Sequence, residues 1–274
     1  MRKGYSGAMV SVLDGRVVRK TGTAIDAQGR YCTELGARVC PNILNVREDE
    51  YTMELLGEPD IADENLLHEY VREVRLLLRR EVWNRRLFDR EQFTPRSTLS
   101  WKTRLCEWSA MVETLLDDLY RDNERDRFCM IHGDPTLANL LYTEDGFARL
   151  CDPIRPVGKI PPLPEVDAGK LLQSVAGWEH VACGWPSLFH DPGYAESAAR
   201  IVVGELNERR CHFWLMVHLL RIVPYARDPS STHVLRWAEH GSLVAYNDLL
   251  KERPLCDTLS TLTELSRTLA KPSA

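Results

Sequence analysis

The segment that most constrains the fold of this chain comprises residues 131–152. Two apolar pieces flank a polar loop and a short turn, an order that predicts a strand, a loop and a small hairpin. Asp134, Asn139 and Asp152 would then converge at the mouth of that hairpin. Such a set suits phosphoryl transfer, in which Asp134 takes a proton from an attacking hydroxyl. Asn139 and Asp152 would hold Mg²⁺ on the phosphates of a nucleotide.

Composition narrows the class of protein. The chain has 274 residues, enough to bury the core of one domain with two lobes, and its net charge is −5. That charge argues against a nucleic-acid interface spread over the surface, so no nucleic-acid partner is expected. No apolar run suits a signal peptide or a membrane span, and the eight cysteines include no Cys-x-x-Cys pair. We therefore expect a cytoplasmic protein with reduced thiols and no membrane partner.

The first residues contain a glycine-rich turn, which precedes a predicted hairpin. Gly4, Ser6 and Gly7 make up this turn, and the Asp14-Gly15 pair marks the hairpin. Because glycine has no Cβ, the backbone N–H groups of such a turn can approach phosphates closely. We therefore place Gly4, Ser6 and Gly7 at a nucleotide. A plain turn without a ligand is the alternative, since glycine pairs of this kind are common.

The polar loop resembles a known catalytic loop. His132-x-Asp134-x4-Asn139, followed by Asp152, matches the catalytic loop and the metal aspartate of the aminoglycoside-phosphotransferase and choline-kinase branch of the protein-kinase-like superfamily. Pro153 follows Asp152, where protein kinases have Phe-Gly, and this favours the small-molecule branch. The resemblance extends over most of the chain up to about residue 179.

The resemblance implies a bilobal α+β fold of the protein-kinase-like type. A small β-rich lobe of residues 1–56 would bind the nucleotide, and a larger helical lobe of residues 57–274 would complete the catalytic site. Gly57-Glu58-Pro59 would break the chain between them. The implied activity is transfer of the γ-phosphate of ATP (or GTP), with Mg²⁺, to a hydroxyl of a sugar, aminoglycoside, nucleoside or amino-alcohol. The acidic net charge would suit a cationic acceptor.

The same resemblance assigns nucleotide contacts in the N-terminal lobe. Val18 would cover the adenine, and Lys20, on the same face of one strand, would reach the α- and β-phosphates. A helix expected over residues 28–39 would offer Glu34 as the ion-pair partner of Lys20. A solvated strand end, with Arg19 as the competing cation, is the alternative for Lys20. A surface carboxylate is the alternative for Glu34.

A second predicted strand resembles the segment that connects the lobes in this family. Met53 would pack beside the adenine ring, while backbone groups of Glu54 and Leu55 would hydrogen-bond the edge of the base. An ordinary edge strand is the alternative.

Two further residues match positions that support the catalytic loop in the family. His132 would hold the loop backbone, and catalysis as a base is the less favoured role. Asp167, near the start of the next predicted helix, would accept hydrogen bonds from the loop backbone; it also suits the first turn of a helix.

Three residues near the reaction centre are candidates for contact with the acceptor. Arg155 and Lys159 could stabilise the transferred phosphate or hold an anionic group, or else face water. Trp178 could stack on a sugar or a base, or else pack in the core.

Helical periodicity fills most of the remaining chain. An arginine-rich amphipathic helix is expected after Asp63, with a solvated face of ion pairs as the simpler interpretation and anion binding as the other. Further helices are expected over residues 101–121, 165–173, 194–209, 212–223, 232–250 and 259–269.

Two other hypotheses are kept. A nucleotide-binding or regulatory protein on a kinase scaffold, catalytically weak or inactive, is suggested by the short N-terminal region, where only three residues precede Gly4. A protein kinase is disfavoured because the Asp-Phe-Gly and Ala-Pro-Glu signatures are missing. The sequence indicates neither the acceptor nor the oligomeric state.

Overall fold

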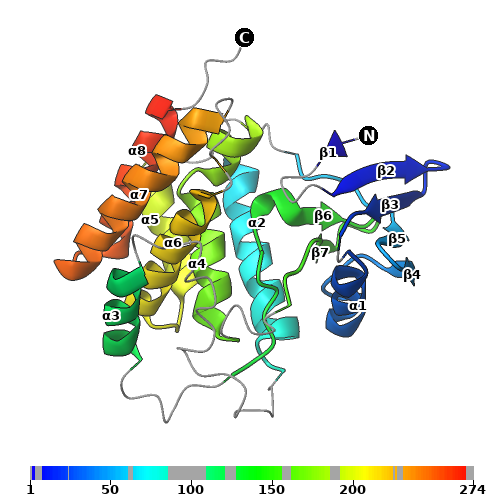
Figure 1. Cartoon of the computed structure of the whole chain (residues 1–274), viewed down its shortest axis with the longest axis horizontal. Helices are drawn as coiled ribbons and strands as arrows, with labels where there is room; N and C mark the ends of the chain where they lie inside the picture. Colours follow the sequence, from blue (N-terminus) through cyan, green and yellow to red (C-terminus); the bar gives the residue numbers. More distant parts are fainter. Residues whose placement is uncertain are drawn as a thin grey trace.

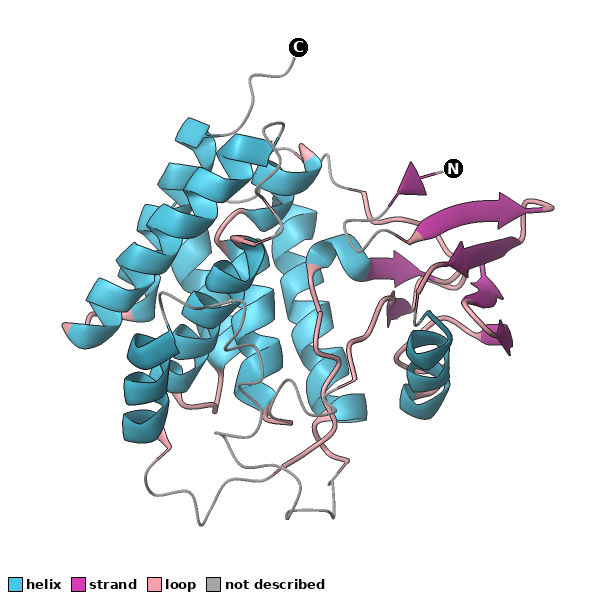
Figure 2. Ribbon diagram, viewed as in Figure 1, coloured by secondary structure: helices cyan, strands magenta, loops and turns pink. Residues whose placement is uncertain are grey.

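Strands gather at one end of the molecule and helices form the rest, an α+β arrangement in two parts (Figure 1, Figure 2). The computed structural model describes residues 2–3, 8–23, 25–60, 64–85, 109–120, 128–155, 162–185, 192–224, 226 and 231–269. Gly4, Ser6, Gly7 and Lys159, which were expected at the nucleotide and the acceptor, lie outside these residues.

The N-terminal part is an antiparallel sheet with strand order β1-β2-β3-β5-β4. Its strands are β1 (Arg2–Lys3), β2 (Met9–Leu13), β3 (Val17–Thr21), β4 (Ile43–Arg47) and β5 (Glu50–Glu54). Alternation along β3 buries Val18 and Lys20 and exposes Arg19. Across the sheet Val18 faces Met53 and Lys20 faces Tyr51. Lys20 is therefore the inward cation of β3, and Arg19 points to the other face.

Helix α1 (Ile25–Leu35) packs against this sheet. It ends four residues before the predicted boundary at residue 39, because Gly36 follows it with a positive φ of 86°. A left-handed glycine directly after the last helical residue is a common helix stop. Residues 36–39 form a turn, whose last residue, Val39, is fully buried.

A two-stranded hairpin lies between the sheet and the helices (Figure 1). It consists of β6 (Leu140–Tyr142) and β7 (Ala148–Leu150), preceded by one 3₁₀ turn (Leu137–Asn139). Gly57, just after β5, exchanges two backbone hydrogen bonds with Tyr142, and the Leu150 N–H donates to the Val39 carbonyl at 2.7 Å. The hairpin is thus attached to the N-terminal part at two points.

Helices make up the other part of the molecule (Figure 2). They are α2 (Glu64–Leu77), a π-helical turn (Leu78–Val82), α3 (Ser109–Leu119), α4 (Pro164–Val175), a second π-helical turn (Glu179–Cys183), α5 (Pro192–Val203), α6 (Glu208–Ile222), α7 (Thr232–Leu250) and α8 (Leu255–Leu269). None of the helices within the described ranges is long and apolar enough to cross a membrane.

Helices α4 and α6 form the centre of this part. Every residue of α6 from 211 to 220 is buried, as expected for a core helix that is covered on all sides. Gly169 of α4 allows close contact, because a Cβ there would lie 2.5 Å from the Trp214 Cβ and 2.7 Å from the Leu215 N. This packing fixes the position of α4, which carries Asp167 and Lys170.

Arg75 modifies the expectation for the arginine-rich helix. It is 4% exposed, its Nε donates to the Val202 carbonyl at 2.7 Å, and its guanidinium lies 4.4 Å from the centre of the Trp83 ring. Arg75 is therefore a structural cation between α2 and α5, whereas Arg72 of the same helix and Arg79 of the π-helical turn after it are exposed.

Candidate active site

Asp167 holds the backbone of the polar loop. Its Oδ2 accepts from the His132 N–H at 2.8 Å and from the Trp83 Nε1–H at 3.0 Å, and its Oδ1 accepts from the Gly133 N–H at 2.7 Å. Burial raises the pKa of Asp167 to about 6, and these three donors oppose the rise. Gly133 has a φ of +81°, and a Cβ there would lie 2.4 Å from the Ile154 carbonyl oxygen. The loop therefore requires both this carboxylate and this glycine.

His132 is fully buried beneath the loop. Its Nδ1 accepts from the Asp134 N–H at 3.4 Å, and its carbonyl accepts from the Ile154 N–H at 2.7 Å. Burial lowers the pKa of His132 to about 4, so the ring is neutral near pH 7. A buried neutral ring that ties two parts of the loop together is suited to support.

Asp134 follows Gly133 and is partly exposed. Its Oδ2 accepts from Asn139 Nδ2 at 3.0 Å, and its Oδ1 lies 3.0 Å from Lys170 Nζ. Burial alone would raise the pKa of Asp134, but the Lys170 ammonium lowers it below the ordinary value. Lys170 was not among the expected site residues. Its spacing of three from Asp167 on one helix face was the signal that could have found it.

Asn139 is held by a network that the sequence did not reveal. The Leu137 N–H donates to Ser174 Oγ at 3.1 Å, and the Ser174 hydroxyl donates to Glu179 Oε1 at 2.7 Å. The Ala138 N–H donates to the same Glu179 oxygen at 3.2 Å. Both side chains are fully buried and reach the 3₁₀ turn from α4 and from the π-helical turn after it. They fix the turn that carries Asn139.

Asp152 pairs with the lysine of β3. Lys20 Nζ lies 2.5 Å from Asp152 Oδ1, and the Tyr51 hydroxyl donates to the same oxygen at 3.4 Å. Asp152 has a φ of +59°, a backbone conformation that is uncommon for residues other than glycine. Its neighbour Cys151 donates its N–H to the Asn139 carbonyl at 2.9 Å. Asp152 and Asn139 are thereby brought to the same end of the hairpin.

Glu34 does not take the expected place. Its Oε2 lies 3.3 Å from Arg155 Nη2, with 43% and 54% of the two side chains exposed, whereas Lys20 pairs with Asp152. The expected Lys20–Glu34 pair is therefore wrong. The reason lies in the position of Glu34 in the last turn of α1. Gln28, about 9 Å earlier along the axis, is the helix residue that reaches the segment after Asp152, where its Nε2 donates to the Pro153 carbonyl at 3.4 Å.

The expected adenine contacts are placed only in part. Val18 and Met53 are each 7% exposed and lie opposite one another on the inner face of the sheet. The Glu54 N–H already donates to the Asn42 carbonyl at 3.0 Å, and the Leu55 N–H to the Arg16 carbonyl at 2.9 Å. Backbone groups of Glu54 and Leu55 were expected at the edge of the base. Their N–H groups are taken by these two bonds, and a contact through their carbonyl groups stays a prediction.

The candidate acceptor residues lie on different elements. Arg155 is placed beside α1, where it pairs with Glu34 and lies 5.9 Å from the centre of the Tyr31 ring. The Trp178 ring lies 5.8 Å from Lys170 Nζ and 6.2 Å from the centre of the Trp237 ring. Trp178 therefore both packs in the core and adjoins the cation beside Asp134.

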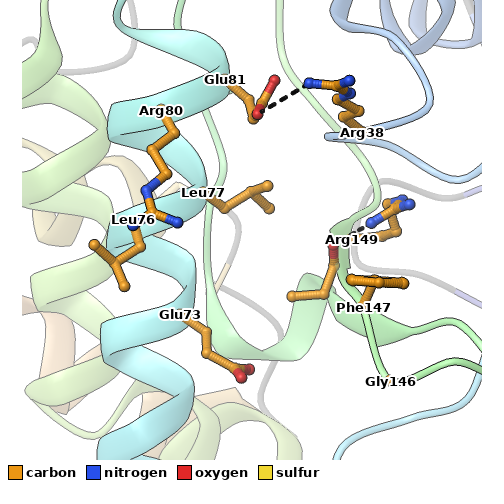
Figure 3. A pocket seen from close by; sticks show the side chains of 10 residues that line it. Arg38, Glu73, Leu76, Leu77, Arg80, Glu81, Gly146, Phe147 and Arg149 are labelled. Carbon is orange, nitrogen blue, oxygen red and sulfur yellow. Dashed lines mark hydrogen bonds and ion pairs between the residues drawn. The ribbon is translucent and has the colours of Figure 1, made fainter.

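A pocket of about 490 Å³ lies apart from these residues, between the end of the hairpin turn with the start of β7 on one side and α2 with the π-helical turn after it on the other (Figure 3). Arg38, Arg80 and Arg149 surround it, with Glu81 extending toward Arg38 at 3.8 Å and with Phe147 at its edge. It shares no lining residue with the Asp134 site.

Comparison with known proteins supports the fold and leaves the sequence relationship distant. No family model matches the sequence, and no curated protein matches it significantly. Among solved structures, the choline kinase of Streptococcus pneumoniae superposes with a TM-score of 0.53 at 10% identity, covering 96% of this chain and 89% of that one. A choline/ethanolamine kinase family protein of Mesorhizobium loti gives 0.53 at 14% identity, covering 93% and 89%.

A glucosamine kinase in complex with glucosamine, ADP and inorganic phosphate gives a TM-score of 0.50 at 14% identity, covering 93% of this chain and 82% of that one. These structures are small-molecule kinases of the protein-kinase-like superfamily. The bilobal α+β architecture expected from the sequence is therefore confirmed, and this chain has the protein-kinase-like fold.

Proposed function

We propose that this chain transfers the γ-phosphate of ATP (or GTP) to a hydroxyl of a small molecule. The observation that carries the proposal is that two pairs of a carboxylate and a lysine lie around Asn139. Asp134, with Lys170, lies on one side of it, and Asp152, with Lys20, follows Cys151 on the other. A hydroxyl-orienting carboxylate beside two metal-binding side chains and a phosphate-binding lysine is the constellation that phosphoryl transfer needs. The likeness of the fold to choline and glucosamine kinases supports a small acceptor.

The oxygen donors at the end of the hairpin fit a magnesium ion that arrives with a nucleotide. Asp152 would bind the ion through its carboxylate, and Asn139 would bind it through the oxygen of its side-chain amide. Mg²⁺ commonly takes one or two protein ligands together with phosphate oxygens. Among the described residues, no three or more His, Cys, Asp or Glu side chains gather into a metal site of their own. An ion with this ligand set would neutralise charge on the transferred phosphate.

The N-terminal part would bind the rest of the nucleotide. Val18 and Met53 offer an apolar surface for the base, and Lys20 has the reach to meet the phosphates. Gly4, Ser6 and Gly7 would cover the phosphates with backbone N–H groups. In this proposal residues 1–56 are the nucleotide-binding lobe and residues 57–274 form the catalytic and acceptor-binding lobe.

Asp134 would orient the acceptor hydroxyl and accept its proton late. Its lowered pKa keeps the carboxylate ionised and makes it a weak base. A weak base suffices where the transition state is loose and the attacking oxygen is little bonded to phosphorus, so most of the rate enhancement comes from positioning and charge neutralisation.

Substitution of the two carboxylates tests the proposal. Asp134→Asn and Asp152→Asn should each lower ADP formation, measured with Mg-ATP and a library of hydroxyl metabolites, by roughly 10²–10⁴-fold. Asp145→Asn, in the exposed hairpin turn, is the matched control and should keep full activity. Full turnover in either site variant would rule out the assignment.

A second candidate is a nucleotide-binding or regulatory protein without turnover. The pairing of both carboxylates with lysines, Asp134 with Lys170 and Asp152 with Lys20, favours it. Calorimetry with Mg-ATP beside the ADP-formation assay separates the two candidates. Binding without consumption on any acceptor would support the regulatory function.

A further inference from the structure

The side of Asp134 that faces α4 and α6 is positively charged. Lys170 Nζ lies 3.0 Å from Asp134 Oδ1, and only 12% of the Lys170 side chain is exposed. Its ammonium is also 5.8 Å from the centre of the Trp178 ring, which can stabilise the charge from its π-face. An acceptor hydroxyl in contact with Asp134 would therefore come within a few ångströms of a buried cation.

Arg221 of α6 adds a second positive charge. Its Nη1 lies 3.2 Å from His218 Nδ1, and His218 Nε2 lies 2.9 Å from the Val166 carbonyl on α4. Helices α4 and α6 run antiparallel, since Gly169 lies against Trp214 and Val166 lies against His218. Long helical side chains lean toward the N-terminus of their helix, so Lys170 leans toward Val166 and Arg221 leans toward His218. The charge of Arg221 acts on Asp134 as well, since it contributes to the lowered pKa of that carboxylate.

The carboxylates near Lys170 are engaged by other donors. Glu179 is the other carboxylate that acts on Lys170, but its Oε1 already accepts from Ser174 and from the Ala138 N–H. Burial raises the pKa of Glu179, and its hydrogen bonds with Ser174 and the Ala138 N–H oppose the rise. Asp167 accepts from the His132 and Gly133 N–H groups and from Trp83. Asp134 would be engaged with the acceptor hydroxyl.

We infer that the phosphate acceptor carries an anionic group, a carboxylate or a phosphate, close to its reacting hydroxyl, and that Lys170 binds this group with Arg221 adding to the field. The inference rests on the proposed function and narrows its substrate class. It reverses the expectation of a cationic acceptor that the net charge of −5 suggested. A bulk charge averages the whole surface, whereas recognition depends on the charges within a few ångströms of the ligand.

A series of three-carbon diols that differ in charge tests the inference. 3-Aminopropane-1,2-diol, glycerol, glycerate and glycerol 3-phosphate are titrated calorimetrically into the full chain with Mg-ADP present. The affinity should rise in that order, with glycerol 3-phosphate at least about tenfold tighter than glycerol. The relative affinity of glycerate and glycerol 3-phosphate identifies the carboxylate or the phosphate as the preferred group. Equal affinities, tighter binding of the amine, or no binding of either anion at about 10 mM would overturn the inference.

Two variants locate the effect. Lys170→Met should reduce the preference for glycerol 3-phosphate over glycerol by at least about fivefold, while Lys251→Met, at an exposed position, should leave it unchanged. An unchanged preference in Lys170→Met would overturn the assigned role. Affinity for Mg-ADP is measured separately. Its absence in the unaltered chain would contradict the proposed function, whereas a bound nucleotide with a preference for the amine would contradict the acceptor class alone.

Discussion

Replacement of Gly133 by alanine should destabilise the protein far more than the same change at Gly146. The two glycines share a left-handed backbone, with φ of +81° and +78°, so alanine costs each about 1 kcal/mol of conformational strain. A Cβ at Gly146 would meet no atom within 4 Å. A Cβ at Gly133 would lie 2.4 Å from the Ile154 carbonyl oxygen, where real contacts are not under 3.0 Å. The two positions therefore share the backbone strain and differ in the space around an added Cβ.

The magnitude follows from what must move. The Ile154 carbonyl would have to retreat by at least about 0.6 Å, and the Ile154 N–H donates to the His132 carbonyl at 2.7 Å. Loss of that bond costs about 1 kcal/mol and overpacking costs about 1–3 kcal/mol more. We therefore expect Gly133→Ala to lower the free energy of unfolding by about 3–5 kcal/mol, and Gly146→Ala by about 1 kcal/mol.

Urea unfolding measures both values, and ADP formation reports the site. Because the Gly133 N–H also donates to Asp167, a shift of the loop should displace Asp134 and lower turnover in Gly133→Ala, while Gly146→Ala keeps it. Equal losses of stability in the two variants would refute the steric reasoning, since they would show that the loop relaxes without cost.

Two further predictions concern the supports of the loop. Ser174→Ala should lower the free energy of unfolding by about 1–3 kcal/mol, because it leaves the buried Leu137 N–H without its acceptor. The same variant should need a higher Mg²⁺ concentration for half-maximal activity. An unchanged Mg²⁺ requirement would contradict a link between Ser174 and Asn139. Asp167 has a folded-state pKa of about 6, above its ordinary value of 3.8, so its stabilising contribution is complete below the lower value and is lost as the pH rises through the higher one. Between pH 6 and pH 5 the unaltered chain should therefore gain about 1 kcal/mol relative to Asp167→Asn in urea unfolding, and parallel pH profiles would disprove the raised pKa.

Local sequence patterns anticipated the parts of the site that depend on short-range geometry. Asp134, Asn139 and Asp152 are brought together by one loop and one hairpin, and the alternation of β3 is enough to turn Lys20 inward. The expected partner of Lys20, Glu34, was misplaced because α1 ends before Gly36, which puts Glu34 in its last turn. Which helix residue faces Lys20 also depends on how the helix lies on the sheet.

The remaining contacts come from residues distant in the chain. Ser174 and Glu179 meet the 3₁₀ turn only after α4 has packed on α6, and a buried glutamate in a π-helical turn has no periodic signature. Backbone groups of Glu54 and Leu55 were assigned to a ligand, but their N–H groups bond the Asn42 and Arg16 carbonyls, because strand patterns do not show where pairing ends. Tertiary packing decides such contacts.

Because the hairpin is attached to the N-terminal part, Asp152 and Asp134 are held by different sets of contacts. Gly57 and Val39 tie the hairpin to the sheet and α1, and Lys20 ties Asp152 to the same region. Asp134 is fixed to the helices through Lys170 and to the start of the hairpin through Asn139. Rotation of the sheet relative to the helices would therefore act on the contact between Asp134 and Asn139, which joins the carboxylate that would orient the hydroxyl to the hairpin before Asp152. The geometry of the reaction centre therefore depends on how the two parts of the molecule are oriented relative to each other.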